Sequence, residues 1–302
     1  MLSFKTPTIE DKFLIGKILG DTKNFGSENT FGNIFLWRNY FGTKICVYEN
    51  YLLKMYKDKE GNIGYASPVG VDIGNKNECK RIVDILINDA KDRGVNFVLN
   101  GLLEEEVKIL ESIFPNRFSF SEQRDSEDYI YKSSDLVNLK GKKYHGKRNH
   151  IAKFKKIHEF EYEDLLLSNI NECSDFIDLW FKENNKQPDI SLEYEYLAIK
   201  EMLLYYKELN FKSGIIRINK KIVAFTAGEE LNKDTFVIHF EKAFHNYEGV
   251  YSVINNEFAK RNLEKYIYIN REEDMGLPGL RKSKLSYHPY ILLKRYKAKF
   301  CL

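Results

Sequence analysis

Cysteine is scarce in this sequence of 302 residues, and its four copies lie far apart, at Cys46, Cys79, Cys173 and Cys301. None belongs to a C-x-x-C pair, which argues against a disulfide framework and a zinc site and favours a reducing compartment. Long hydrophobic runs are also missing, since no window approaches the ~18 apolar residues of a membrane span. The N-terminal residues, MLSFKTPTIEDKF, contain no apolar signal-peptide core. We therefore expect a cytoplasmic protein without an integral membrane segment.

A strong net charge is absent as well. The formal net charge is only +3, which is too small by itself to indicate a nucleic-acid-binding protein. The 43% of hydrophobic and 30% of charged residues are typical of a globular protein, and the length suffices for about two domains. What matters for function is therefore where the charges lie along the chain.

The second half of the chain has a clear pattern of helices and strands. Apolar residues recur at helical spacing over 172–184 and 191–209, and Ser191 is the expected N-cap of the second helix. Tight turns are expected at Asn219-Lys220 and Asn232-Lys233. The other predicted elements are strands 213–219, 221–231, 234–243, 265–270 and 289–300 and helix 249–262. The order β-α-α-β-β-β-α-β-α-β predicts a mixed sheet with helices on both faces, and it resembles the fold of the GCN5-related N-acetyltransferases (GNAT).

The first half repeats this order less clearly. Two strands, 43–50 and 51–58, are expected to meet at Glu49-Asn50. The other predicted elements are strands 62–66 and 95–100, helices 8–19, 77–94 and 102–113, and a final pair of strands within 117–133. We therefore predict an α/β (α+β) protein with two GNAT-like domains in tandem, at 1–139 and 159–302, joined by a basic linker helix at 140–158.

The linker KGKKYHGKRNHIAKFKKIH (140–158) has eight Lys or Arg, three His and no acidic residue. One interpretation is a solvated helix face between two domains. The other is a polyanion site for a tRNA, a coenzyme A phosphate or a lipid head group, with Lys147, Arg148 and Lys153 as the candidate contacts. The spacing of His145 and His150 does not align them on one helix face, and no carboxylate or thiol joins them, so no metal site is expected.

A loop before helix 249–262 tests for coenzyme A binding. In acetyltransferases this loop reads Gln/Arg-x-x-Gly-x-Gly/Ala, and its backbone N–H groups hold a pyrophosphate. Here it reads HNYEGVY (245–251), which keeps Gly249 but places Tyr251 at the final small position. This tyrosine argues against ordinary acetyl-CoA chemistry, whereas Gly249 at a helix start can still hold an anion.

Several longer motifs resemble one known family. They are WRNYFG after TFGN, the linker KKYHGKRNHIAKFKK, and HFEKA, YEGVYSVINNEFA and INREEDMGLPGLRKSKLSYHP. Over essentially its whole length, the sequence resembles the family named for the C-terminal domain of phosphatidylglycerol lysyltransferase. The resemblance implies a tandem GNAT-like fold, similar to that of the Fem-type transferases, and transfer of an amino acid from aminoacyl-tRNA to an amine or hydroxyl. The chain lacks the large membrane domain of the lysyltransferases proper, which leaves the acceptor open between a small molecule and a lipid head group.

Direct acyl transfer requires a base or positioned water beside the acceptor, and donors for the developing oxyanion. Glu241 lies at the end of a predicted strand, where acetyltransferase folds often place a general base, and His239 is expected on the same side of the sheet. Asn255 belongs to a polar patch on the following helix. A packed core histidine, a strand-end ion pair and a solvated helix face are the alternative interpretations.

The stretch YINREEDMGLPGLRKSKLSYHP (268–289) contains the remaining candidates. Asn270 and Asp274 are expected to orient an acceptor amine, and Arg281 and Lys284 to hold phosphate. The alternative is a helix with acids at its start, Pro278 in its first turn and bases at its end. The sequence does not decide which half holds the catalytic site, although the richer polar motifs favour the second.

Two other functions remain open at this stage. One is an acyl-CoA-dependent N-acetyltransferase with a degenerate loop, and the other is a binding or regulatory module that has lost its chemistry. No Ser-His-Asp or Cys-His arrangement can be read from the chain, so covalent catalysis is not expected. Aminoacyl-tRNA is the expected donor, with acetyl-CoA as the alternative.

Overall fold

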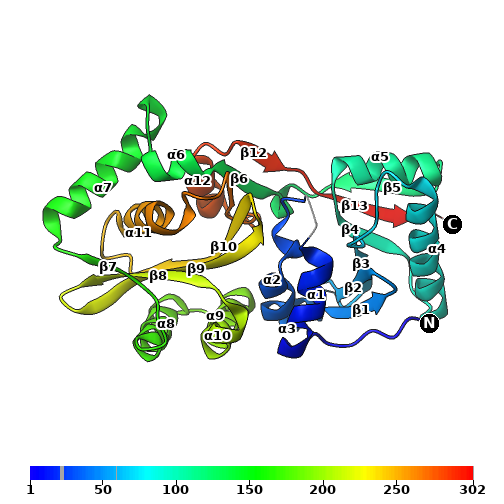
Figure 1. The fold of residues 1–302 in the computed structure, drawn as a ribbon, viewed down its shortest axis with the longest axis horizontal. Helices are drawn as coiled ribbons and strands as arrows, with labels where there is room; N and C mark the ends of the chain where they lie inside the picture. Colours follow the sequence, from blue (N-terminus) through cyan, green and yellow to red (C-terminus); the bar gives the residue numbers. More distant parts are fainter. Residues whose placement is uncertain (21–23, 59, 302) are drawn as a thin grey trace.

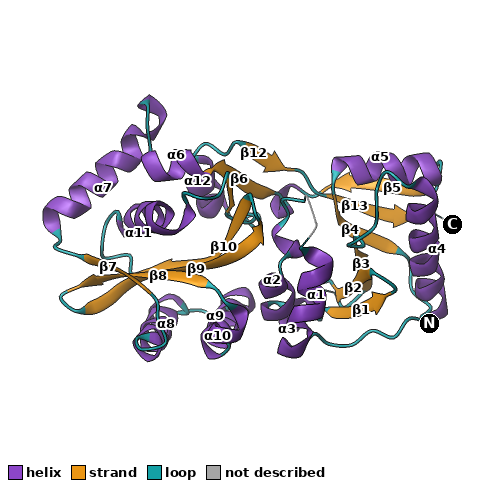
Figure 2. Cartoon of the chain, in the orientation of Figure 1, coloured by secondary structure: helices purple, strands orange, loops and turns teal. Residues whose placement is uncertain are grey.

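The computed structural model describes residues 1–20, 24–58 and 60–301. Within them lie two mixed sheets, with strand orders β1-β2-β3-β4-β13-β5 and β12-β6-β11-β10-β9-β8-β7. Figures 1 and 2 show the sheets end to end along the long axis of the molecule, with helices packed on both faces. The predicted α/β class with mixed sheets is confirmed.

The first sheet is built mainly from the first half of the chain. Its strands and the helices around them are α1 Lys12–Leu19, α2 Phe31–Leu36, α3 Arg38–Phe41, β1 Lys44–Tyr48, β2 Tyr51–Lys57, β3 Ile63–Ala66, α4 Lys76–Asp92, β4 Val98–Leu102, α5 Glu104–Ile113 and β5 Phe118–Glu122. β1, β2 and β3 pair antiparallel, and β3 and β4 pair parallel. The predicted turn between β1 and β2 is present, and Glu49 in it has a positive φ of 54°.

The second half follows the predicted order of elements. They are β6 Asp128–Lys132, α6 Ser133–Asn138, α7 His145–Ile157, β7 Glu161–Asp164, α8 Ile170–Asn184, α9 Ile190–Leu204, α10 Tyr206–Leu209, β8 Lys212–Ile218, β9 Lys221–Asn232, β10 Thr235–Ala243, α11 Val250–Phe258, β11 Tyr268–Asn270, α12 Pro278–Leu285, β12 Ile291–Leu293 and β13 Tyr296–Phe300. The N-cap of α9 is Asp189 and not Ser191, because the Asp189 carboxylate accepts the N–H groups of Ser191 and Leu192.

Two strand predictions are wrong, because the halves exchange strands. The expected pair within 117–133 is divided between the sheets: β5 pairs with β13, whereas β6 lies between β11 and β12. The expected single strand 289–300 is also divided, into β12 in the second sheet and β13 in the first. The domain boundaries at 139 and 159 stay a prediction, since the exchanged strands connect both sheets.

The two halves also share a hydrophobic core. One cluster of buried side chains includes Ile15 and Phe35 from the first half and Trp180 and Ile199 from the second. Burying such a side chain stabilises the fold by about 1.5–3 kcal/mol, so this cluster fixes how the halves pack. No helix of the described chain combines the length and the apolar character that crossing a membrane requires.

Candidate functional site

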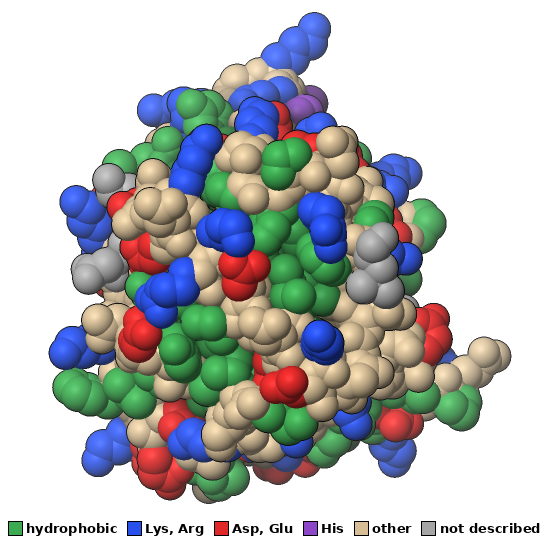
Figure 3. Space-filling model, turned by 90° about the vertical axis from the view of Figure 1, so that its right-hand side faces the viewer, with side chains coloured by type: hydrophobic (Ala, Val, Ile, Leu, Met, Phe, Trp, Pro, Cys, Tyr) green, Lys and Arg blue, Asp and Glu red, His purple; other side chains and the backbone are tan. Residues whose placement is uncertain are grey.

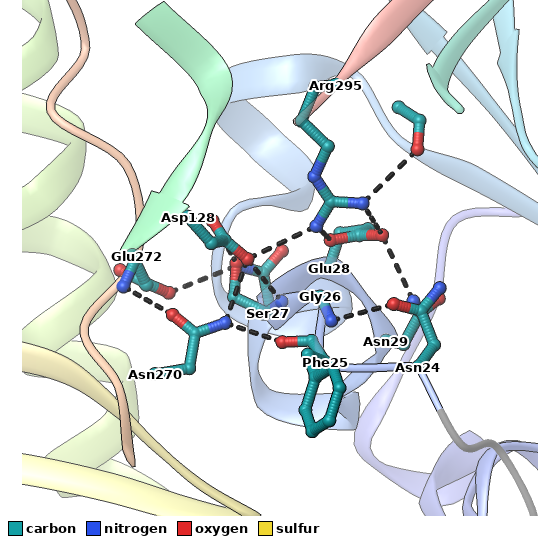
Figure 4. A network of polar contacts seen from close by, with 12 residues as sticks. Asn24, Phe25, Gly26, Ser27, Glu28, Asn29, Asp128, Asn270, Glu272 and Arg295 are labelled. Atoms are coloured by element: carbon teal, nitrogen blue, oxygen red, sulfur yellow. Dashed lines mark hydrogen bonds and ion pairs between the residues drawn. The ribbon is translucent and has the colours of Figure 1, made fainter. Parts of the chain in front are cut away.

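A buried polar network joins the two sheets where β6, β11, β13 and residues 24–29 meet (Figure 4). The Asp128 carboxylate accepts from the backbone N–H of Ser27 at 2.9 Å, from Asn270 Nδ2 at 2.8 Å and from Arg295 Nη2 at 3.2 Å. Arg295 also forms a bidentate pair with Glu28, at 3.0 and 2.6 Å. Asn270, predicted to orient an acceptor, is therefore fully engaged at the junction of the halves.

Lys54 in β2 extends this network. Its Nζ donates to the backbone oxygen of Glu28 at 2.9 Å and to Asn29 Oδ1 at 3.3 Å. The side chain is buried, and burial lowers the pKa of Lys54. Lys54, Glu28 and Asn29 also line a cavity of about 1940 Å³, so one end of the buried network faces a hollow.

This cavity begins at the carboxyl ends of β3 and β4. Parallel pairing there is limited to Tyr65 with Leu99 and Ala66 with Asn100, and Ala66 and Asn100 line the cavity together with Ser67. In open α/β sheets, ligands bind at this edge. The position corresponds to the expected ligand site of a GNAT-like sheet, but in the first half of the chain and not in the second.

Both halves form the walls. Tyr40 of α3 and the preceding Trp37 contribute from the first half of the chain. The start of α9 contributes Ile190 and Tyr194 from the second half. The rings of Tyr40 and Tyr194 pack edge to face at 5.2 Å, which closes one wall across the two halves. A ligand in the cavity would therefore contact both halves at once.

The polar floor of the cavity contains the carboxyl group of Glu106, whose pKa is raised. Glu106 in α5 accepts from Ser67 Oγ and, at 2.6 Å, from the backbone N–H of Leu103. Burial is the main reason why the pKa of Glu106 is raised, and Glu28 adds to it. A carboxyl group with a raised pKa beside a buried lysine is the kind of pair that general acid–base chemistry uses.

A second group of polar side chains lies outside the cavity, between β10, β11 and α11. It contains the predicted Glu241, Asn255 and Lys147 and the neighbouring Arg271. Arg271 Nη2 lies 3.1 and 3.0 Å from the Glu241 carboxylate, and Asn255 donates to it at 3.3 Å. Lys147 Nζ lies 3.7 Å from the centre of the Tyr287 ring. Burial and the nearby Arg271 lower the pKa of Lys147 to about 8. None of these residues lines the cavity.

The alternation of a regular strand predicts that His239 lies on the same side of the sheet as Glu241. In the structure, His239 does not lie beside Glu241. A bulge in β10 between Ile238 and Phe240 shifts the register, so His239 lies 2.7 Å from Glu272 and 3.0 Å from Glu229. Burial opposes the charged ring, but Glu272 and Glu229 outweigh it and raise the pKa of His239 to about 10. The expectation of a common side is wrong, and the contacts give His239 the environment of a buried ion pair.

Asp274 and Arg281 bind each other. Arg281 Nε lies 2.8 Å from the Asp274 carboxylate, which also accepts from Tyr129 at 2.5 Å and Arg124 at 3.2 Å. Burial opposes ionisation, yet Arg281, Tyr129 and a backbone N–H hold the pKa of Asp274 well below its usual range. Lys284 is buried as well and donates to two backbone carbonyls. Neither Arg281 nor Lys284 therefore presents an unpaired cation on the predicted helix face.

The coenzyme loop is filled by the protein itself. The Tyr251 hydroxyl lies 3.2 Å from both the N–H and the C=O of Ala243. Gly249 has a φ of 89°, and a Cβ at this position would lie 2.8 Å from the backbone oxygen of His150 in α7. The loop N–H of Val250 already donates to Tyr247. The linker helix and Tyr251 thus occupy the space that a pyrophosphate requires.

Helix α7 carries the basic linker along an outer edge of the molecule (Figure 1). Arg148 donates to the backbone oxygens of Leu139 and Gly141, and Lys153 pairs with Glu248 at 2.5 Å. Two of the three predicted polyanion contacts thus have partners on the surface, and Lys147 is the half-buried third. Exposed lysines of the linker without an ion pair in the described chain are Lys140, Lys142 and Lys156.

Sequence reasoning missed the residues of the cavity floor. Lys54 had a usable signal, because it interrupts the apolar strand YLLKMYK between the buried residues Leu53 and Met55. Asn100 is a polar residue inside β4, near the edge of the sheet where ligands bind. Glu106 had no such signal, since it belongs to an acidic helix start that capping alone explains. In the described ranges, no three metal-binding side chains gather as a cation site requires.

Comparison with known proteins gives a matching family and similar solved structures. Residues 20–299 match the family model described as "Phosphatidylglycerol lysyltransferase, C-terminal". A conserved protein of unknown function from Bacteroides thetaiotaomicron is 38% identical, with a TM-score of 0.92 and 100% of both chains covered. L-PGS from Bacillus licheniformis is 13% identical, with a TM-score of 0.69 over 99% of this chain and 94% of that one.

A curated relative is an uncharacterised protein of Mycoplasmoides gallisepticum, 25% identical over 184 residues. The match covers 58% of this chain and 56% of that relative, so the chain spans little more than half of the relative's length. The predicted tandem GNAT-like fold is confirmed.

Proposed function

The chain belongs to the phosphatidylglycerol lysyltransferase C-terminal family, and on that premise we propose that it is an aminoacyltransferase. The reaction would move an amino acid from the 3′ end of an aminoacyl-tRNA to an amine or hydroxyl acceptor. The acceptor atom forms a bond to the ester carbonyl carbon, the ester C–O bond breaks, and the acceptor proton passes to the leaving hydroxyl. This chemistry requires positioning, a proton acceptor and a donor for the oxyanion.

The cavity between the halves is the observation that carries the proposal. It combines a volume of about 1940 Å³ with a floor that holds a buried lysine and a half-buried carboxyl group with a raised pKa. We assign Glu106 the role of proton acceptor, since a raised pKa makes a carboxylate a better base. We assign Lys54 the role of stabilising the oxyanion, because an ammonium in a water-poor site stabilises developing negative charge.

The residues predicted in the second half receive positioning roles in this proposal. Asn270 bonds to Asp128, and through Arg295 and Glu28 the same network reaches the cavity floor. Glu241 is bound by Arg271, and Asp274 by Arg281, so each carboxylate is already occupied. Their substitution would therefore act on folding before it acts on chemistry.

The basic helix α7 is proposed to attract the tRNA. Its exposed lysines neutralise phosphates and release counterions, which makes such binding weaken steeply with salt. The opposite end of the molecule, with α4 and α5, mixes Lys and Arg with Asp and Glu (Figure 3). The charge distribution therefore favours α7 over that end.

Titration with unacylated tRNA at several salt concentrations tests this proposal. Lys142→Ala with Lys156→Ala should weaken binding about tenfold and reduce the salt slope by about 2, since each lost phosphate contact removes nearly one unit. Lys76→Ala with Lys91→Ala on α4 makes the same charge change on exposed lysines at the other end. Equal weakening by both pairs, or no binding by the wild type, would remove the tRNA from the proposal.

A further inference from the structure

We propose that the cavity recognises its ligand by a primary ammonium group, with Glu106 and Asn100 as acceptors and the aromatic wall against an apolar body. This deepens the proposed function and rests on it only in calling the ligand a substrate. Binding itself is independent of any tRNA or transfer step. The ligand class is therefore an amine with an aromatic or aliphatic body.

The charge of the lining favours a cation. Six acidic side chains line the cavity, against three lysines, although the whole chain has a net charge of +3. The acidic ones are Glu28, Asp58, Asp72, Glu105, Glu106 and Asp189, and the basic ones are Lys54, Lys57 and Lys186. The cavity is thus locally acidic in a mildly basic protein, which attracts cations and repels carboxylates.

The buried floor has one carboxylate more than it has cations. Arg295 pairs with both Glu28 and Asp128, and Lys54 donates to backbone and amide oxygens beside them. Glu106 forms no ion pair within the part of the chain that the structure describes. Its raised pKa is the response expected of a buried carboxylate without a cation. An ammonium ligand would supply the missing charge.

Asn100 supplies a second signal. Its Oδ1 is buried and has no hydrogen-bond partner among the described residues. Buried polar atoms are nearly always hydrogen-bonded, and the residue that carries this unpaired acceptor lines the cavity, which favours a ligand with N–H or O–H groups. An ammonium, which has three donors and no acceptor, can serve Asn100 and Glu106 together.

The walls determine the rest of the ligand. Trp37 and Ile34 from the first half face the cavity together with Ile190 and Leu192 from the second. Apolar walls with few polar groups at one end are typical of sites that bind an apolar body and orient it by its polar head. The ammonium can belong to an acceptor amine or to the amino group of an aminoacyl donor.

Calorimetric titration with four soluble probes tests the proposal on the full chain without tRNA. Phenethylamine carries the ammonium, 2-phenylethanol and phenylacetate replace it by a hydroxyl and a carboxylate, and phenylalaninamide represents the donor. We expect phenethylamine to bind at least tenfold more tightly than 2-phenylethanol, and phenylacetate not to bind. A further tenfold gain for phenylalaninamide would assign the site to the donor, and equal or weaker binding would assign it to the acceptor.

Two variants and a matched control locate the effect. Glu106→Gln keeps the shape of the side chain and should weaken phenethylamine at least tenfold while changing 2-phenylethanol less than twofold. Asn100→Leu should weaken both probes. Glu104→Gln makes the same charge change on an exposed side chain of α5 that is not among the lining residues, and should change the affinity for phenethylamine less than twofold. Tightest binding by phenylacetate, or equal losses in Glu104→Gln and Glu106→Gln, would overturn the proposal while leaving tRNA binding and transfer to be judged separately.

Discussion

Arg295, the residue before β13, lies 3.2 Å from Asp128 in β6, although 167 residues separate them in the chain. Each residue belongs to the neighbourhood where the two sheets exchange strands, and both side chains are almost fully buried. Glu28 binds the same guanidinium and lines the cavity. The ion pair therefore connects the stability of the fold to the geometry of the candidate site.

Arg295→Met should lower the free energy of unfolding by about 3–5 kcal/mol, because it leaves the buried Asp128 and the half-buried Glu28 without their cation. Urea denaturation monitored by circular dichroism measures this change. Arg81→Met removes an exposed bidentate partner of Glu49 and should have a much smaller effect. Comparable losses in the two variants would show that the junction is not a buried ion-pair network.

His239 should make the stability of the protein dependent on alkaline pH. Its pKa rises from 6.5 to about 10 on folding, so the stability it contributes is fully present below about pH 6.5 and is lost as the pH rises through 10. His239→Asn should cost about 3 kcal/mol at pH 7, and the difference from wild type should shrink towards pH 10. Urea titrations at several pH values measure this. A difference independent of pH, or the same curve for the exposed control His245→Asn, would contradict the assignment.

Gly249→Ala should destabilise the protein by about 1–3 kcal/mol. The position has a left-handed φ of 89°, and the new Cβ would meet the backbone oxygen of His150. Gly16→Ala, in the exposed middle of α1 with open space around it, should instead stabilise by about 0.5–1 kcal/mol. Thermal unfolding of both variants checks the packing of α7 on α11, which is refuted if Gly249→Ala is neutral.

Acetyl-CoA should not bind. The Tyr251 hydroxyl is hydrogen-bonded to the backbone of Ala243, and α7 covers the start of α11. The loop therefore cannot approach a pyrophosphate as the acetyltransferase loop does. Calorimetry at millimolar acetyl-CoA should show no saturable heat. Micromolar saturable binding would restore the N-acetyltransferase alternative.

The order of elements in the second half could be predicted from sequence, because helical and strand periodicities are local. The turn at Asn219-Lys220 is an example, since both residues adopt the positive φ that such a hairpin favours. The exchange of β6 and β13 could not be predicted, because the pairing of two strands depends on residues more than a hundred positions away. The bulge at His239 likewise has no local signature.

The candidate site was harder to predict for a physical reason. Conspicuous charge in the stretch 268–289 directed attention to the second half, where Asp274 and Arg281 neutralise each other. Lys54, Asn100 and Glu106 are single polar residues in separate elements, and only the fold brings them to one cavity. Charge density in this sequence therefore marks ion pairs, whereas the cavity is lined by isolated polar residues that the fold brings together.

Transfer of label from charged tRNA is the most direct test of the proposed aminoacyltransferase activity. The protein is incubated with tRNA charged with radioactive amino acids and with a mixture of small amines and lipids, and label is followed into the fraction that is not tRNA. We expect transfer by the wild type and by Glu104→Gln, with a loss of at least about a hundredfold in Lys54→Met and about tenfold or more in Glu106→Gln. Label that stays on the tRNA with the wild type, or transfer that survives in Lys54→Met and Glu106→Gln, would contradict it.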